Sequence, residues 1–109
     1  MKVSTRFADG VAVVSVAGEV DMFTSPELRQ ELHRLTSDAV PRIVVDLGQV
    51  SFMDSSGIAT LVQALKEARP FGGELFLAAP GETVLRVLRL ANLTSLFKVH
   101  DTVEGAIEA

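Results

Sequence analysis

Short runs rich in valine, isoleucine and leucine alternate along this 109-residue chain with segments that have the period of an amphipathic helix. A short apolar run bounded by turn residues is typical of a buried strand, whereas apolar residues three and four apart indicate one face of a helix. The predicted strands cover Val11–Ala17, Ile43–Leu47, Leu75–Ala78 and Phe97–Val99, and the predicted helices begin near Ser25, Ser55, Val84 and Val103. This alternation predicts a mostly parallel sheet whose strands are joined by right-handed helical crossovers.

The first segment of the chain predicts one exception to the parallel order. Residues 2–7 alternate between two faces, which is the pattern of a half-buried edge strand. Asp9-Gly10 follows, and this dipeptide between two strands is a strong signal for a tight hairpin. The expected fold is therefore α/β, with a mostly parallel sheet of about five strands, an antiparallel N-terminal edge strand and about four helices, in one domain over residues 1–109.

Charge and cysteine content exclude several classes of function. The formal net charge of −4 argues against direct binding to nucleic acid or to an anionic membrane, both of which favour basic patches. The absence of cysteine excludes disulfides and thiolate metal sites. No apolar run approaches the roughly 18 residues that span a bilayer, and Met1-Lys2-Val3-Ser4 does not open a signal peptide. We expect a cytoplasmic protein.

The helix starting near Ser25 carries two signals for its first turn. Thr24 and Glu27 have the spacing of a capping box, and Phe23 with Leu28 would form the hydrophobic staple that accompanies it. Proline prefers the first helical position, so Pro26 favours Ser25 as the cap instead.

Two further helices carry features that bear on the surface of the domain. Ile58, Leu61, Val62 and Leu65 place one apolar face on a helix over residues 55–68. The face opposite should point outward and present Thr60, Gln63, Ala64 and Glu67. After the third helix, Asn92 is expected to form a left-handed cap.

Polar residues follow two neighbouring strands at the edge where functional groups collect in open α/β sheets. Asp21 and Thr24 come after the second strand, and Asp54-Ser55-Ser56-Gly57 follows the short apolar stretch Val50–Met53. A helix start carries unpaired N–H groups and a partial positive charge, so it tolerates an anion such as a phosphate. Two interpretations remain open from the residues alone: plain helix capping, or a serine that gains and loses a phosphoryl group. Gly57 favours the second, because it costs stability in a helix and leaves room for something to approach the backbone.

The same residues do not form an enzyme active site. A serine hydrolase needs a Gly-x-Ser-x-Gly elbow, but Met53 and Asp54 stand two residues before Ser55 and Ser56. The two histidines, His33 and His100, fall on a helix flank and at a strand end, and no phosphate-binding Gly-x-x-x-x-Gly-Lys loop is present. Asp21 and Asp54 supply two hard ligands at most, fewer than a dedicated cation site takes. We therefore expect no catalytic residue, no metal and no cofactor.

The chain resembles the STAS domain, and more narrowly the small single-domain bacterial anti-sigma factor antagonists. The resemblance rests on Gly18-Glu19-Val20-Asp21, Thr24-Ser25-Pro26-Glu27-Leu28, Val44-Val45-Asp46-Leu47 and Phe52-Met53-Asp54-Ser55-Ser56-Gly57-Ile58, and it extends from the first hairpin to the last helix. Two positions depart from the common pattern. Asn92 and Ala59 stand where the family often has glycine.

This resemblance implies a partner-switching phosphoprotein that regulates transcription. In such proteins the serine directly after the aspartate, here Ser55, is phosphorylated by an anti-sigma factor that is itself a serine kinase. The unphosphorylated form binds that kinase and releases a sigma factor, the phosphorylated form does not bind, and a serine phosphatase resets the cycle. The residues implied in partner binding are Asp21, Thr24, Asp54, Ser56, Gly57, Thr60 and Gln63.

A second class of function stays open at the level of sequence. STAS subunits also serve as structural or nucleotide-sensing modules beside a transporter or in a sensory assembly. Such modules need not keep the Asp-Ser-Ser-Gly sequence of residues 54–57 intact, so its presence here favours the antagonist.

Overall fold

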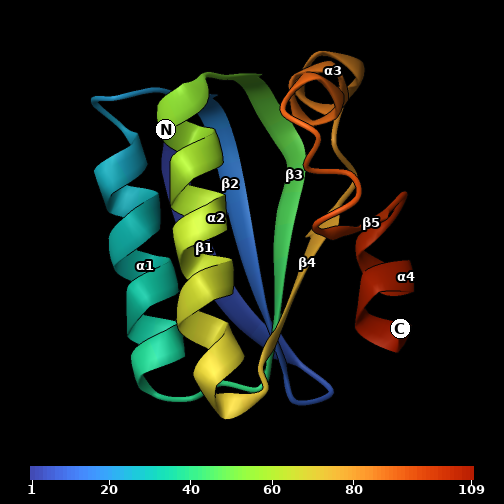
Figure 1. Ribbon diagram of the computed structural model, residues 1–109. Coiled ribbons are helices and arrows are strands. Elements are labelled where there is room, and N and C mark those ends of the chain that lie inside the picture. Colours follow the sequence, from blue (N-terminus) through green and yellow to red (C-terminus); the bar gives the residue numbers. More distant parts are fainter.

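The computed structural model describes residues 1–109, which form five strands and four α-helices in the predicted order (Figure 1). The strands are β1 (Lys2–Ala8), β2 (Val11–Val20), β3 (Arg42–Met53), β4 (Glu74–Ala78) and β5 (Lys98–His100). The α-helices are α1 (Ser25–Ser37), α2 (Ser55–Ala68), α3 (Glu82–Leu90) and α4 (Val103–Glu108), and a 3₁₀ turn η1 (Arg69–Phe71) follows α2. No helix is long and apolar enough to cross a bilayer.

The five strands form one sheet in the order β1-β2-β3-β4-β5. β1 pairs with β2 in the antiparallel sense, and every other neighbouring pair is parallel. The predicted mostly parallel sheet with an antiparallel N-terminal edge strand is confirmed. Its parallel strands therefore end at one common edge, where the loops that follow β2 and β3 leave the sheet.

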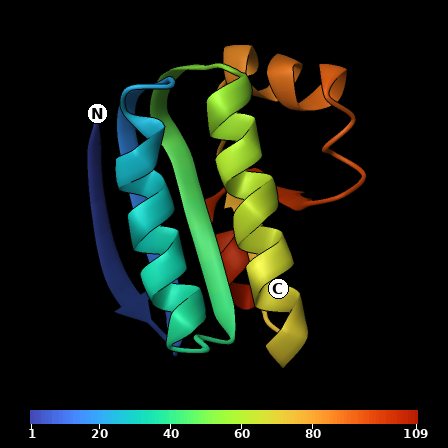
Figure 2. The same cartoon turned by 60° about the vertical axis from the view of Figure 1, so that its left-hand side comes forward.

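Two layers of helices bury the sheet unequally. α1 and α2 lie side by side across one face (Figures 1 and 2), where Leu32 and Leu61 are fully buried in the main core with Val45. Leu88 of α3 joins this same core. On the opposite face only the short α4 packs down, through Ala106, so the rest of that face is open.

The predicted turn and cap residues adopt the required backbone. Asp9 and Gly10 both have positive φ, at 52° and 77°, as a tight type I′ hairpin needs. Asn92 has φ 59°, and the N–H of Leu93 donates to the carbonyl oxygen of Leu88 at 2.8 Å. This is the left-handed helix end predicted for Asn92.

β2 and β3 are longer than the apolar runs that predicted them. β3 continues through the stretch 50–53, which the sequence set apart, and β2 extends to Val20. Beyond Asp46 one face of the sheet is open, so β3 carries exposed Gly48 and Gln49 between buried residues and loses its continuous apolar character. Gly18 (φ 96°) lies between two register shifts of the β2–β3 ladder.

The predicted capping box and hydrophobic staple at the start of α1 are wrong. Thr24 occupies the N-cap position but its side chain makes no capping bond, because its hydroxyl accepts from the N–H of Asp21 at 2.9 Å instead. Phe23 is 84% exposed while Leu28 is fully buried, so the two do not pack as a staple. The turn before the helix has its own hydrogen-bond network, and this displaces the standard motif.

Candidate functional site

The two polar segments meet at the carboxyl edge of the sheet, as predicted. The last rung of the β2–β3 ladder pairs Val20 with Met53, so Asp21 and Asp54 are the next residues on neighbouring strands. The N–H of Asp54 donates to the carbonyl oxygen of Val20 at 3.1 Å and ties the two loops together. In Figure 1 both loops lie at the upper end of the sheet, at the start of α1 and of α2.

Asp54 caps α2. Its Oδ1 accepts from the N–H of Ser56 at 2.9 Å and from that of Gly57 at 3.4 Å, and it also accepts the hydroxyl of Ser56 at 2.5 Å. The Ser56 hydroxyl holds the pKa of the Asp54 carboxyl below its usual range; partial desolvation opposes this, and the backbone N–H bonds reinforce it. Asp54 therefore carries its negative charge at the first turn of α2.

The two adjacent serines are in different states. The Ser56 hydroxyl is half-buried and bound to Asp54, whereas Ser55, the first residue of α2, is exposed and its hydroxyl makes no hydrogen bond within the chain. Ser55 also sits where the helix dipole favours an added negative charge. Of the two hydroxyls, only that of Ser55 is presented to an approaching molecule.

Gly57 is buried against the chain's own side chains. A Cβ at this position would lie 2.6 Å from Cγ of Met53 and 2.9 Å from Cγ1 of Val20. The close approach expected at this glycine therefore comes from the ends of β2 and β3. Gly57 lets the first turn of α2 settle onto the sheet edge, and the side of its backbone predicted to be free is occupied.

Asp21 and Thr24 fix the turn between β2 and α1. Oδ1 of Asp21 accepts from the N–H of Phe23 at 2.9 Å and of Thr24 at 3.0 Å. The Thr24 hydroxyl lies 2.9 Å from the carbonyl oxygen of Glu19, to which it donates. Both predicted site residues thus lie at the same edge as Ser55, and the side chains of both form hydrogen bonds that stabilise the turn.

The predicted orientation of α2 is wrong for two of its four residues. Thr60 and Ala64 are each 2% exposed and pack between the helix and the rest of the domain, whereas Gln63 is exposed and Glu67 half-buried. The Thr60 hydroxyl donates to the carbonyl oxygen of Ser56 at 2.9 Å, which satisfies it inside the helix. Because α2 packs against both the sheet and α1, its buried face is wider than the apolar stripe in the sequence predicted. Thr60 is not available to a partner on the surface, but Gln63 is.

Sequence reasoning missed three exposed apolar side chains at this edge. Phe23 is 84% exposed, Met22 is 68% exposed, and Phe52, one residue before the end of β3, is 44% exposed. Met22 and Phe23 occupy a turn between Asp21 and Thr24, and two adjacent large apolar residues in a turn were a signal available from the sequence. Exposed aromatic side chains in a rigid loop are typical of binding surfaces.

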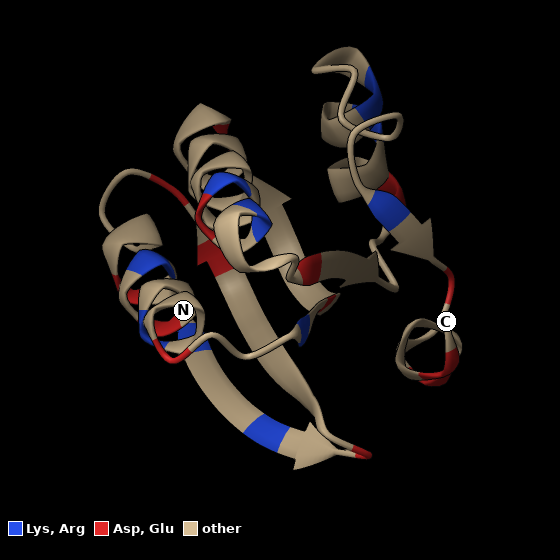
Figure 3. Ribbon diagram, turned by 60° about the horizontal axis from the view of Figure 1, so that its bottom comes forward, with Lys and Arg blue, Asp and Glu red and all other residues tan.

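Lys and Arg are spread over the domain and gather in no single patch (Figure 3). None occurs between Arg6 and Arg29 or between Arg42 and Lys66, the two stretches that build the candidate edge. The carboxylates at this end of β2 and β3 or in the first turn of α1 are those of Glu19, Asp21, Glu27 and Asp54. A cation reaches the same end of the sheet on β1, where Lys2 pairs with Ala17.

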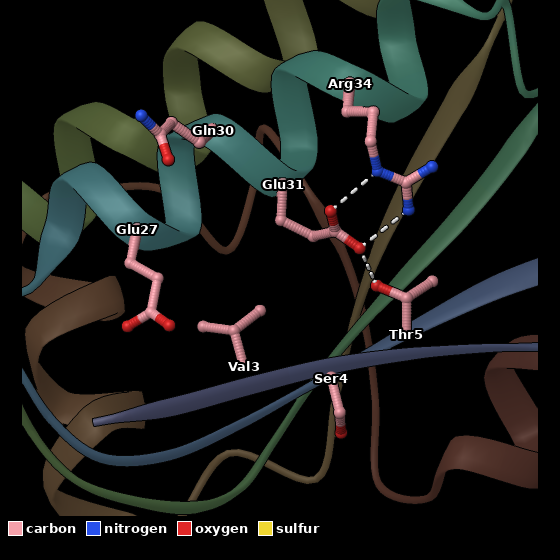
Figure 4. A pocket seen from close by; sticks show the side chains of 7 residues that line it. All are labelled: Val3, Ser4, Thr5, Glu27, Gln30, Glu31 and Arg34. Carbon is pink, nitrogen blue, oxygen red and sulfur yellow. Dashed lines mark hydrogen bonds and ion pairs between the residues drawn. The ribbon is translucent and has the colours of Figure 1, made fainter.

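The largest surface hollow lies elsewhere, between β1 and α1 (Figure 4). It measures about 360 Å³, and in it Glu31 accepts two hydrogen bonds from Arg34, at 2.9 and 2.8 Å, and one from the hydroxyl of Thr5. None of the predicted site residues lines it. The chain also holds no cluster of three or more residues that could bind a metal ion. The candidate site is an exposed edge of the sheet and lies away from this hollow.

Comparison with known proteins agrees with the resemblance drawn from the sequence. The profile of the STAS domain matches residues 2–106. The anti-sigma-B factor antagonist of Staphylococcus aureus is 31% identical over 104 residues, covering 95% of this chain and 96% of that protein.

Solved structures agree as well. An anti-sigma factor antagonist from Mycobacterium paratuberculosis superposes with a TM-score of 0.91 at 32% identity, covering 98% of this chain and 91% of the other. The unphosphorylated form of the anti-sigma factor antagonist SpoIIAA gives a TM-score of 0.86 at 25% identity, with 98% and 94% covered, and SpoIIAA has also been solved in its phosphorylated form.

Proposed function

Because the chain belongs to the STAS domain family, we propose that it is an anti-sigma factor antagonist that is switched by phosphorylation of Ser55. Its unphosphorylated form binds an anti-sigma factor that is a serine kinase, and this binding releases a sigma factor. The kinase transfers a phosphoryl group to Ser55 and the complex separates. A serine phosphatase then restores the binding form.

The observation that carries this proposal is the contrast between Ser55 and Ser56. The Ser55 hydroxyl is exposed and unbonded at the start of α2, while that of Ser56 is bound to Asp54. A kinase needs a hydroxyl that it can reach and align with the γ-phosphate of its nucleotide. The names of relatives, which are anti-sigma factor antagonists, support the partner class.

The expected effect of the phosphate is on binding and not on the fold. It adds about −1.5 to −2 charges. In the free domain this charge faces water and the N-terminus of α2, so the helix tolerates it despite the neighbouring carboxylate of Asp54.

In the complex the same phosphate faces an anionic group of the partner, such as the phosphates of the kinase's nucleotide. Each pair of unit charges about 4 Å apart costs on the order of 4 kcal/mol at an effective dielectric constant of 20. Since about 1.4 kcal/mol is a tenfold change in affinity, a single phosphate can weaken binding a hundredfold or more.

The experiment has two steps. Purification of the chain from its source cells, followed by mass spectrometry, identifies the kinase bound to it. The purified kinase with ATP is then incubated with the chain and with the Ser55→Ala and Ser56→Ala variants. We expect phosphate on the parent and on Ser56→Ala, and none on Ser55→Ala. Phosphate on Ser55→Ala would move the acceptor to another hydroxyl. Recovery of a transporter ATPase in place of a kinase would favour a structural STAS module.

A further inference from the structure

The turn between β2 and α1 exposes two large apolar side chains at the same edge as Ser55. Phe23 is 84% exposed and Met22 68% exposed, and we call this pair the apolar tip. Single exposed apolar side chains are common on protein surfaces, whereas adjacent ones often mark an interaction site. The pair Met22 and Phe23 therefore indicates a contact with another molecule.

The tip stands on a rigid base. The carboxylate of Asp21 accepts from the N–H groups of Phe23 and Thr24, and the carbonyl oxygen of Asp21 accepts from the N–H of Ser25 at 2.8 Å. The Thr24 hydroxyl links the same turn back to β2 through Glu19. Because the backbone is already fixed, ordering the tip on binding costs less entropy than ordering a flexible loop.

The surroundings of the tip are acidic. Glu19, Asp21, Glu27 and Asp54 lie on the segments that form this edge, and Lys2, opposite Ala17 on β1, is a cation at the same end of the sheet. The carboxylates outnumber it. A second copy of this chain would bring the same carboxylates together, and an anionic lipid surface would repel them. Charge complementarity therefore selects a basic protein surface.

We propose that the apolar tip inserts into an apolar pocket, rimmed by Lys and Arg, on the anti-sigma factor kinase. This inference rests on the proposed function and adds a second element to it. The tip supplies affinity and orientation, whereas Ser55 supplies the switch. The tip takes no part in the phosphoryl transfer. Removing its two apolar side chains should therefore weaken docking without changing the chemistry at Ser55.

The test compares the double variant Met22→Ser/Phe23→Ser with the control Phe7→Ser. Phe7 is also large, apolar and exposed (61%), but it pairs with Ala12 at the start of β2, the opposite end of the strand from the tip. Circular dichroism checks that each variant is folded. Isothermal titration calorimetry with the purified kinase then measures the Kd.

We expect the double variant to bind at least tenfold more weakly and Phe7→Ser to bind like the parent. In phosphorylation assays the double variant should raise the KM of the chain as substrate and leave kcat unchanged. A double variant with the parent's Kd would overturn the inference while the proposed function stands. A parent chain that neither binds the kinase nor is phosphorylated by it would end both.

Two further measurements distinguish the surfaces that the tip could bind. Raising NaCl from about 50 to 300 mM should weaken kinase binding of the parent several-fold, because a basic rim facing carboxylates is screened by salt. A salt-independent Kd would contradict the basic rim. Analytical ultracentrifugation of the free chain should show a monomer, and a dimer that the double variant dissolves would assign the tip to a second copy instead.

Discussion

Oδ1 of Asp54 accepts a hydrogen bond from the hydroxyl of Ser56 at 2.5 Å, and this bond distinguishes Ser56 from its neighbour Ser55. It fixes Ser56 as part of the helix cap and leaves the preceding hydroxyl, that of Ser55, free in solvent. A carboxylate directly before the exposed serine thus has a local structural role, whatever the partner contributes.

The two serines should differ in stability as well as in reactivity. Replacing Ser56 with alanine removes a hydrogen bond from the cap and should lower the free energy of unfolding by about 0.5–1.5 kcal/mol. Replacing Ser55 with alanine removes no hydrogen bond and should change it by less than about 0.5 kcal/mol. Urea denaturation of both variants and the parent measures the difference. A larger loss for Ser55→Ala would contradict the assignment of the cap.

The cap should also make stability depend on pH. The pKa of the Asp54 carboxyl is held low by the Ser56 hydroxyl in the folded chain, so it lies below the value of the unfolded chain, about 4. The ionised carboxylate therefore stabilises the fold fully above about pH 4, and this contribution is lost as the pH falls through the folded pKa.

Other carboxyls titrate in the same window, since hydrogen bonds from Arg34 lower the pKa of Glu31. The measurement is therefore the difference in unfolding free energy between the parent and Asp54→Asn at pH 6 and at pH 3. We expect the advantage of the parent to shrink at pH 3. A difference that stays constant over this range would show that folding does not lower the pKa of the Asp54 carboxyl, which would contradict the cap.

Gly57 should not tolerate a side chain. A Cβ there would overlap Met53 and Val20, whose atoms lie 2.6 and 2.9 Å from its position, so Gly57→Ala should destabilise the domain by about 1–3 kcal/mol. Gly81→Ser is the control, because Gly81 caps α3 with φ −67°, a Cβ there would meet nothing within 4 Å, and serine is itself a favourable N-cap residue. Thermal unfolding of the two variants should separate them clearly, and equal melting temperatures would rule out the predicted overlap.

The outward face of α2 can be tested with a single charge. Thr60→Lys forces an ammonium group into a site that is 2% exposed and should lower the unfolding free energy by several kcal/mol. Gln63→Lys, three residues on and exposed, should change it little. Chemical denaturation of both variants decides the matter, and a stable Thr60→Lys would restore this residue to the candidate surface.

Particular residues show what the sequence could and could not predict. Apolar periods predicted the strand and helix order because each element buries one face, and Asp9-Gly10 predicted the hairpin because its turn needs positive φ at both positions. Thr24 does not form the predicted capping box, because its hydroxyl accepts from the N–H of Asp21 and donates to the carbonyl oxygen of Glu19, both of which precede the helix. Thr60 failed because a polar residue can be buried when its hydroxyl bonds within its own helix. The exposure of Met22 and Phe23 depends on a turn geometry that no periodicity describes.

The central claim, that phosphate on Ser55 switches binding and not folding, is tested most directly on the phosphorylated chain itself. The Kd for the anti-sigma factor kinase is measured by calorimetry with the unphosphorylated chain and with the chain phosphorylated on Ser55, each checked by circular dichroism. We predict the same fold in both and binding at least a hundredfold weaker after phosphorylation. Equal affinities for the two forms would contradict the account.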